Sequence, residues 1–174
     1  MDARMKIRQY RPGDKEAVWH LHNLALEGTG AHLGNGPWDD DLRNIEKVYI
    51  DNGGDFLVGD FEGTLVAMGA LKRTDPHRVQ LKRMRIHPEC QRRGFGQLMV
   101  RALEERAVVL GFQIIHLDTT TIQIAAQKLY EKNGFVKVGE DRIAQFDVLL
   151  YEKSLPTTSS NKALDRDCSN LNHG

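Results

Sequence analysis

The chain of 174 residues has little cysteine and no long apolar run. Its two cysteines, Cys90 and Cys168, stand in no metal-binding or redox spacing, so the sequence indicates neither a disulfide scaffold nor a zinc module. The first residues are charged and lack the apolar core of a signal peptide, and no stretch approaches membrane-spanning length. We therefore expect a cytoplasmic protein with free thiols.

Net charge is also lacking, since 24 Lys and Arg balance 24 Asp and Glu. A balanced chain has no bulk attraction to nucleic acid or to a membrane surface, and we expect neither partner. The charges are nevertheless segregated. Residues 72–106 contain ten basic and four acidic residues, a local charge of +6, and residues 27–62 contain nine acidic and two basic residues, a local charge of −7. The basic window suits a polyanionic cofactor, and the acidic window suits either a cationic substrate or a solvated surface.

The most informative stretch is residues 79–110. Apolar and polar residues alternate from Val79 to Leu81 and again from Met84 to Ile86, but the two alternations are out of phase. Because side chains of a strand alternate between its faces, the slip predicts one strand with a β-bulge at the polar pair Lys82-Arg83. A turn rich in Arg and Gly follows, and apolar residues then recur at helical spacing. A strand, a glycine turn and a helix aim backbone N–H groups and a helix dipole at a phosphate.

The turn Gln91-Arg92-Arg93-Gly94-Phe95-Gly96 resembles the Q/R-x-x-G-x-G/A loop with which the GNAT acetyltransferase superfamily binds the pyrophosphate of acetyl-CoA. A Rossmann fingerprint would need a third glycine at Met99, and a Walker A loop would need a Gly-Lys-Ser/Thr that is absent. A second stretch, from Ala126 to Phe135, resembles the family's A-x-x-L-Y-x-x-x-G-F signature. The two motifs stand about 30 residues apart, and the resemblance covers about Met5 to Leu155.

The periodicity and the Gly and Pro positions predict one domain, residues 1–155, followed by a polar, flexible tail, residues 156–174. Strands are expected at 5–10, 56–61, 65–71, 79–86, 113–119, 135–138 and 146–151, and helices at 12–27, 38–52, 95–110 and 120–133. The strands on either side of helix 95–110 should run parallel through a right-handed crossover. The expected fold is α/β, with a mixed, mostly antiparallel sheet of six to seven strands. A bulged central strand is splayed at the acetyl-CoA site and about four helices flank the sheet, as in the GNAT fold.

The resemblance implies transfer of the acetyl group of acetyl-CoA to a primary amine of a small molecule or peptide, by direct attack in a ternary complex. It also implies a cofactor-binding set: Met84, Arg85, Ile86, Gln91, Arg92, Arg93, Gly94, Phe95, Gly96, Gln97, Gln123 and Tyr130. The Met84 N–H is expected to polarise the thioester carbonyl, and the Tyr130 phenol to protonate the leaving thiolate. A packing role is the alternative for Tyr130. We expect no metal, because histidines such as His20 and His22 lack ligand spacing.

The proton acceptor for the amine is left open. Many family members have a Glu at the position of Gln80, and a carboxamide is no useful proton acceptor. His116 and Asp118 on the next strand are substitutes by position only, and a surface pair is the alternative for them. The missing base also keeps a second function open, a CoA-binding regulatory or interaction module with weak catalysis.

The acceptor itself cannot be identified, because the glycine-rich segment 28–37 and the following Asp-rich helix start match nothing specific. Long polar loops often bind substrates, and we assign His32, Trp38 and Asp39, together with Gln80, as candidate substrate residues. Exposed carboxylates here would attract a cationic acceptor; alternatively they only complement a helix N-terminus. No pattern indicates whether the chain forms a homodimer.

Overall fold

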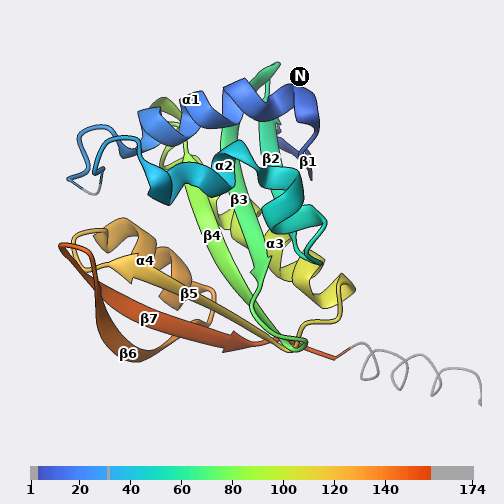
Figure 1. The fold of residues 1–174 in the computed structure, drawn as a ribbon, viewed down its shortest axis with the longest axis vertical. Helices are drawn as coiled ribbons and strands as arrows, with labels where there is room; N and C mark the ends of the chain where they lie inside the picture. Colours follow the sequence, from blue (N-terminus) through green and yellow to red (C-terminus); the bar gives the residue numbers. More distant parts are fainter. Residues whose placement is uncertain (1–3, 31, 158–174) are drawn as a thin grey trace, which may run out of the picture.

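The computed structural model describes residues 4–30 and 32–157, whose strands form one sheet in the order β1-β2-β3-β4-β5-β7-β6 (Figure 1). The strands are β1 Lys6–Gln9, β2 Asp55–Phe61, β3 Thr64–Arg73, β4 Arg78–Ile86, β5 Ile114–Thr120, β6 Val136–Ile143 and β7 Phe146–Ser154. The α-helices of this part of the chain are α1 Lys15–Leu26, α2 Asp40–Arg43, α3 Phe95–Val109 and α4 Ile124–Lys132. The predicted tail lies outside the described residues from residue 158 onward.

The strand directions are those expected from the sequence. Strands β4 and β5 pair in parallel, and the other neighbouring strands pair antiparallel. A parallel pair needs a long crossover, which α3 supplies between β4 and β5. The mixed, mostly antiparallel sheet is therefore confirmed.

The predicted bulge is present in β4. Met68 of β3 pairs with Arg85, but Ala70 pairs with Lys82, so three steps along β4 match two along β3. The backbone of Arg83 takes a left-handed conformation, with φ of 57°, which is uncommon for a residue other than glycine. The extra residue changes which face of the sheet each following side chain meets.

Beyond the bulge, β4 separates from β5. The two strands pair only from Arg78 to Gln80 of β4, although β4 continues to Ile86 and β5 continues along β7 to Thr120. Figure 1 shows the two strands diverging from the end at which they pair. The divergence leaves one edge of β4 without a neighbouring strand, as predicted.

Helices cover both faces of the sheet near β3 and β4. Figure 1 shows α1 and α2 on one face and α3 on the other. On the α3 face, Met99 and Leu103 are fully buried, each burial contributing about 1.5–3 kcal/mol. Gly69 of β3 permits this packing, because a Cβ there would lie 2.5 Å from Leu103 Cδ1. On the other face, Leu21 packs in a second cluster with Tyr49.

The single helix predicted for residues 38–52 is wrong. The segment consists of a 3-10 turn at Pro37–Asp39, then α2, then a π-helical turn at Glu46–Ile50. Asn44 interrupts the helix, and its side-chain Nδ2 donates to the Asp40 carbonyl at 2.9 Å. Such local side-chain bonds compete with helical hydrogen bonding. Leu42, Ile45 and Tyr49 of this segment are nevertheless buried.

Two further boundaries differ from the prediction. Helix α4 begins at Ile124 rather than near Thr120, because Thr120 still pairs with Val148 in β7. Strand β6 extends to Ile143, well beyond the predicted end at residue 138. Both differences result from pairing with β7, which the residues of each segment alone do not show.

Candidate active site

The glycine turn between β4 and α3 has the geometry of an anion site. Arg92 and Gly94 both have left-handed backbones, with φ of 61° and 81°. Helix α3 begins at Phe95, and the first N–H groups of a helix have no acceptor within it. A Cβ at Gly94 would meet no atom within 4 Å, so the space beside these N–H groups is open. Free donors, a helix dipole and open space together fit a pyrophosphate.

The backbone of the turn, more than its side chains, is placed to bind an anion. Phe95 is buried and packs against Phe61, with ring centroids 5.2 Å apart. The exposed Arg93 lies over the Phe61 ring at 4.7 Å, while Gln91 and Arg92 also remain exposed. These contacts hold the turn in place next to β2 and leave its cationic side chains on the surface.

Gly96 and Gln97, which the sequence assigned to cofactor binding, connect α3 to α4. A Cβ at Gly96 would lie 3.2 Å from Leu129 Cδ2, so glycine permits close helix packing here. The Gln97 carboxamide exchanges two hydrogen bonds with Asn133, at 2.6 and 2.9 Å. The Gln97 side chain is thus engaged within the protein, and its contribution to a cofactor would come from the backbone.

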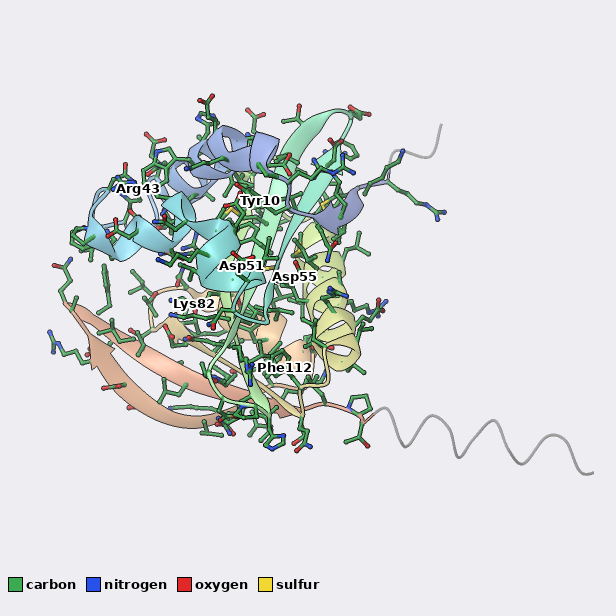
Figure 2. All side chains as sticks on the ribbon, turned by 45° about the vertical axis from the view of Figure 1, so that its right-hand side comes forward. Tyr10, Arg43, Asp51, Asp55, Lys82 and Phe112 are labelled. Carbon is green, nitrogen blue, oxygen red and sulfur yellow. The ribbon has the colours of Figure 1, made fainter. Side chains whose placement is uncertain are left out.

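The edge of β4 next to the opening carries Met84, Arg85 and Ile86. Met84 and Ile86 pack their side chains against the α3 core. Beyond Gln80, the backbone facing β5 has no strand to pair with. This edge can pair with an amide-bearing ligand as an added strand would. Lys82, labelled in Figure 2, lies where β4 leaves β5, and burial lowers the pKa of its ammonium group.

Tyr130 of α4 lies close to this edge. Its ring is 5% exposed and packs edge-on against Phe135, with centroids 5.6 Å apart. Burial raises the pKa of its phenol to about 12, and the nearby Arg85 charge opposes that rise. Within the described residues the Tyr130 hydroxyl forms no hydrogen bond. Tyr130 is therefore protonated at neutral pH and can donate its proton.

Gln123 stands at the N-terminus of α4, as the family pattern suggested. Its Oε1 accepts from the Thr120 hydroxyl at 3.0 Å. Gln123 itself is the residue that precedes the helix, and its side chain makes no capping hydrogen bond to the first turn. A role for Gln123 in cofactor binding stays a prediction.

The residues considered as bases on β4 and β5 all have hydrogen-bond partners within the protein. Gln80 Nε2 donates to Asp118 Oδ2 at 3.0 Å, and His116 Nε2 lies 3.0 Å from the Thr74 hydroxyl. Burial, followed by the Arg78 charge, lowers the pKa of His116. These pairs lie at the end where β4 and β5 are still hydrogen-bonded, away from Met84.

The loop residues assigned to substrate differ in their surroundings. His32 lies 3.0 Å from Asn23 Oδ1 through Nε2 and accepts from the Gly34 N–H through Nδ1. Trp38 is 53% exposed, and its indole N–H donates to the Gly34 carbonyl. Asp39 is only 2% exposed. The expectation that Asp39 presents an exposed charge is therefore wrong.

Asp39 belongs to a buried ionic cluster that the sequence did not predict. It lies 3.0 Å from His22 Nε2 and 3.4 Å from Arg83 Nη1. Arg83 also bonds Asp41 through Nε and Nη2, at 2.9 and 2.6 Å. Burial opposes ionisation of Asp41, but the hydrogen bonds from Arg83 outweigh it and lower the pKa of Asp41. The only feature of the sequence that pointed to this cluster was the phase slip at Lys82-Arg83. It marks the bulge that turns Arg83 to the other face of the sheet.

A cavity of about 100 Å³ lies between α1, the loop after it and β4. Its lining is His22, Leu26, His32, Leu33, Gly34, Trp38, Asp39, Arg83 and Arg85. It therefore brings together three of the sequence-assigned residues, His32, Trp38 and Asp39, with Arg85 of the splayed strand. A larger hollow of about 480 Å³ on α1 has no β4 residue in its lining.

The described part of the chain contains no group of three or more His, Cys, Asp or Glu that could hold a metal ion. The same residues include no helix long and apolar enough to cross a membrane. Cys90 is buried with a free thiol.

Comparison with known sequences gives relatives with named activities. Human N-acetyltransferase 8 is 36% identical over 106 residues, which are 58% of this chain and 47% of that protein. N-acetylaspartate synthetase from Danio rerio is 33% identical over 102 residues, 58% of this chain and 36% of that protein. The chain thus spans less than half the length of these relatives.

Solved structures share the fold. A GNAT-family acetyltransferase from Staphylococcus aureus Mu50 has a TM-score of 0.80 at 21% identity, covering 88% of this chain and 100% of that one. An acetyltransferase from Salmonella typhimurium, solved with its cofactor acetyl-CoA, has a TM-score of 0.72 at 18% identity, covering 88% and 95%. In sequence, residues 15–135 match the acetyltransferase (GNAT) family. The chain therefore belongs to the GNAT acetyltransferase family.

Proposed function

We propose that this protein transfers the acetyl group of acetyl-CoA to a primary amine by direct attack in a ternary complex. The observation that carries the proposal is the splayed edge of β4, which leads directly into an open glycine turn at the start of α3. The edge of β4 can pair with amide groups of the cofactor, and the glycine turn supplies a cluster of N–H donors for its phosphates. Family membership supports the same chemistry.

The cofactor would lie along β4 and across the start of α3. Backbone N–H groups from Arg92 to Gln97 would bind the pyrophosphate. The free edge from Met84 to Ile86 would pair with the pantetheine amides. The Met84 N–H would then face the thioester carbonyl, where a donor stabilises the negative charge that develops on oxygen during attack.

Tyr130 is the proposed acid for the leaving thiolate. A buried phenol with its pKa raised to about 12 keeps its proton at neutral pH and can transfer it to the sulfur as the C–S bond breaks. Gln80 donates to Asp118 and is a carboxamide, so it takes no part as a base.

The alternative is a CoA-binding regulatory module with little or no turnover, and Gln80 is the residue that favours it. Thiol release from acetyl-CoA, followed with a panel of primary amines and checked by mass spectrometry of the product, separates the two. Acetyl-CoA binding in calorimetry without thiol release for any amine would support the module. Loss of both binding and release would refute both functions. A cytoplasmic location and the oligomeric state stay predictions to be tested separately.

A further inference from the structure

Arg85 has an unusual environment for an arginine. Its Nη1 donates to the Met84 carbonyl at 2.9 Å, but its Nε is buried and has no hydrogen-bond partner within the described residues. No carboxylate of the described chain lies within ion-pair distance of Arg85. Arg83, two positions away, has two carboxylate partners, Asp39 and Asp41. The two arginines therefore differ: one is neutralised by the protein and the other is not.

A buried cation without a counter-ion is costly, because desolvation is not offset by pairing. Burial, followed by the Arg83 charge, lowers the pKa of Arg85 to about 10, so the guanidinium is still charged at neutral pH. Part of the side chain remains accessible in the cavity that it lines. These features are typical of an arginine that awaits an anionic ligand.

His22 contributes a second unpaired atom to the same cavity. It is 1% exposed, and its Nε2 lies 3.0 Å from the Asp39 carboxylate. A carboxylate only accepts hydrogen bonds, so Nε2 carries the proton and Nδ1 has a free lone pair. Nδ1 has no partner among the described residues. Two residues that line the cavity therefore each have a buried polar atom without a partner.

Burial and the neighbouring arginines keep His22 neutral. Asp39 contacts it from the 3-10 turn, Arg83 and Arg85 act on it from β4, and the His32 ring lies 6.3 Å away. Burial, followed by Arg85 and Arg83, lowers the pKa of His22 to about 4, although Asp39 opposes the shift. At neutral pH the ring is thus uncharged and can accept an N–H.

The cavity is adjacent to the proposed reaction centre. Arg85 follows Met84 directly in β4, and its charge acts on both His22 and Tyr130. The cavity of about 100 Å³ accommodates the head of a small ligand, with the exposed loop containing Trp38 at its rim. The larger hollow on α1 has no residue of β4 in its lining.

We propose that the acceptor is an amine that also carries a carboxylate, such as an amino acid, with its carboxylate bound by Arg85. This substrate class rests on the proposed acetyltransferase function. It replaces the cationic acceptor that the acidic window predicted, because the buried Asp39 and Asp41 are already paired with Arg83.

The transfer step then balances. The neutral amine nitrogen forms a bond to the acetyl carbonyl carbon, and the C–S bond breaks. The sulfur takes the Tyr130 proton, and the proton that the nitrogen loses passes to solvent. Tyr130 then regains a proton from solvent, which restores the protein. The neighbouring arginine charges favour the neutral form of the amine before attack.

The test compares acids with their amides. Initial rates are measured with L-alanine, β-alanine and L-aspartate, with L-alaninamide and β-alaninamide as carboxylate-free counterparts, and with spermidine as a polycation. The variant is Arg85→Gln, and Arg85→Lys keeps the charge without the forked donor. Arg78→Gln is the matched control: Arg78 is on the same strand but pairs with Glu152 at its other end. Thermal melting checks that each variant folds.

We expect Arg85→Gln to lower kcat/KM for the acids by about 10- to 100-fold and for the amides by less than about threefold. Arg78→Gln should change neither. Because each acid is compared with its own amide, intrinsic amine reactivity cancels.

Equal losses for acids and amides in Arg85→Gln would overturn the inference. So would acetylation of spermidine and the amides but not of the acids, a result that leaves the proposed acetyltransferase function intact. If no amine is turned over, calorimetry in the presence of CoA decides: absence of binding for all three acids overturns the inference. Failure of wild-type protein to bind acetyl-CoA itself would instead refute the proposed function.

Discussion

Gly94 and Gly111 bracket α3 and form a matched pair for testing the pyrophosphate loop. Both have left-handed backbones, with φ of 81° and 88°, and a Cβ added to either would meet no atom within 4 Å. Replacing either glycine by Glu should therefore cost about 1–2 kcal/mol through backbone strain, without a clash. For a domain of this size, that loss lowers Tm by roughly 2–8 °C.

Only Gly94→Glu should abolish acetyl-CoA binding. Its carboxylate would stand beside the first N–H groups of α3, where the pyrophosphate is proposed to bind. Repulsion between two unit charges 4 Å apart near a protein surface is about 4 kcal/mol, which corresponds to roughly a thousandfold loss of affinity. Gly111 follows the other end of a 15-residue helix, about 22 Å away, well beyond the Debye length of about 8 Å.

The assay is calorimetry of acetyl-CoA with wild-type protein and both variants at physiological salt, together with their melting curves. We expect similar Tm losses in the two variants and a lost affinity in Gly94→Glu alone. A folded Gly94→Glu variant with wild-type affinity would show that the loop does not bind the pyrophosphate. Equal affinity losses in both variants would attribute the effect to the strained helix ends instead.

Three further predictions concern single side chains. Tyr130→Phe should lower kcat by roughly 10²-fold at unchanged acetyl-CoA affinity, and an unchanged kcat with a good acceptor would return Tyr130 to a packing role. The pKa of His22 in the folded protein is about 4, below its ordinary value of 6.5. The contribution of His22 to the free energy of unfolding is therefore complete above pH 6.5 and is lost as the pH falls toward 4. The total loss is about 3 kcal/mol. Urea unfolding of wild-type protein across this range should show that loss, and the same loss in His22→Gln would contradict it. Asp39→Asn should lower the free energy of unfolding by about 3–5 kcal/mol, because Arg83 and His22 each lose a buried carboxylate partner. Asp40 lies on the surface, and Asp40→Asn should change the free energy of unfolding by no more than about 0.5 kcal/mol. Similar small losses in the two variants would disprove the buried cluster as a stabilising unit.

The parts of the fold that could be predicted are those encoded locally. The phase slip at Lys82-Arg83 predicted the bulge, and the glycine turn before α3 predicted the helix start. Strand β6 was predicted too short because Val136 and Val138 are 64% and 56% exposed. An edge strand with both faces exposed has no alternation for the sequence to show, so its length follows from pairing with β7.

In the candidate site, too, only the features that depend on neighbouring residues could be predicted from the sequence. The backbone of the cofactor turn could be predicted, since it depends on residues adjacent in sequence. The hydrogen bonding of the Gln97 side chain could not be predicted, because its partner Asn133 lies at the end of α4, far along the chain. Arg85 was not singled out for the acceptor either. Its significance lies in an atom without a partner, and the sequence does not show which donors and acceptors find one another.

The charge of the acceptor site shows why local charge counts mislead. The acidic and basic windows of the sequence meet in the fold, where Asp39 and Asp41 of one neutralise Arg83 of the other. The bulge in β4 determines that Arg83 contacts these carboxylates. Without it, the alternation that buries Val79 and Leu81 on the α3 face would carry the arginines to that same apolar face.

With the bulge, Met84 and Ile86 take the α3 face instead, and the arginines are turned toward α1. The acidic segment supplies carboxylates to Arg83 and none to Arg85. The excess charge left beside Met84 is therefore positive, although the loop above it is acidic in sequence. The sign of the charge that the acceptor meets is thus determined by a single extra residue in β4 and not by the composition of the loop.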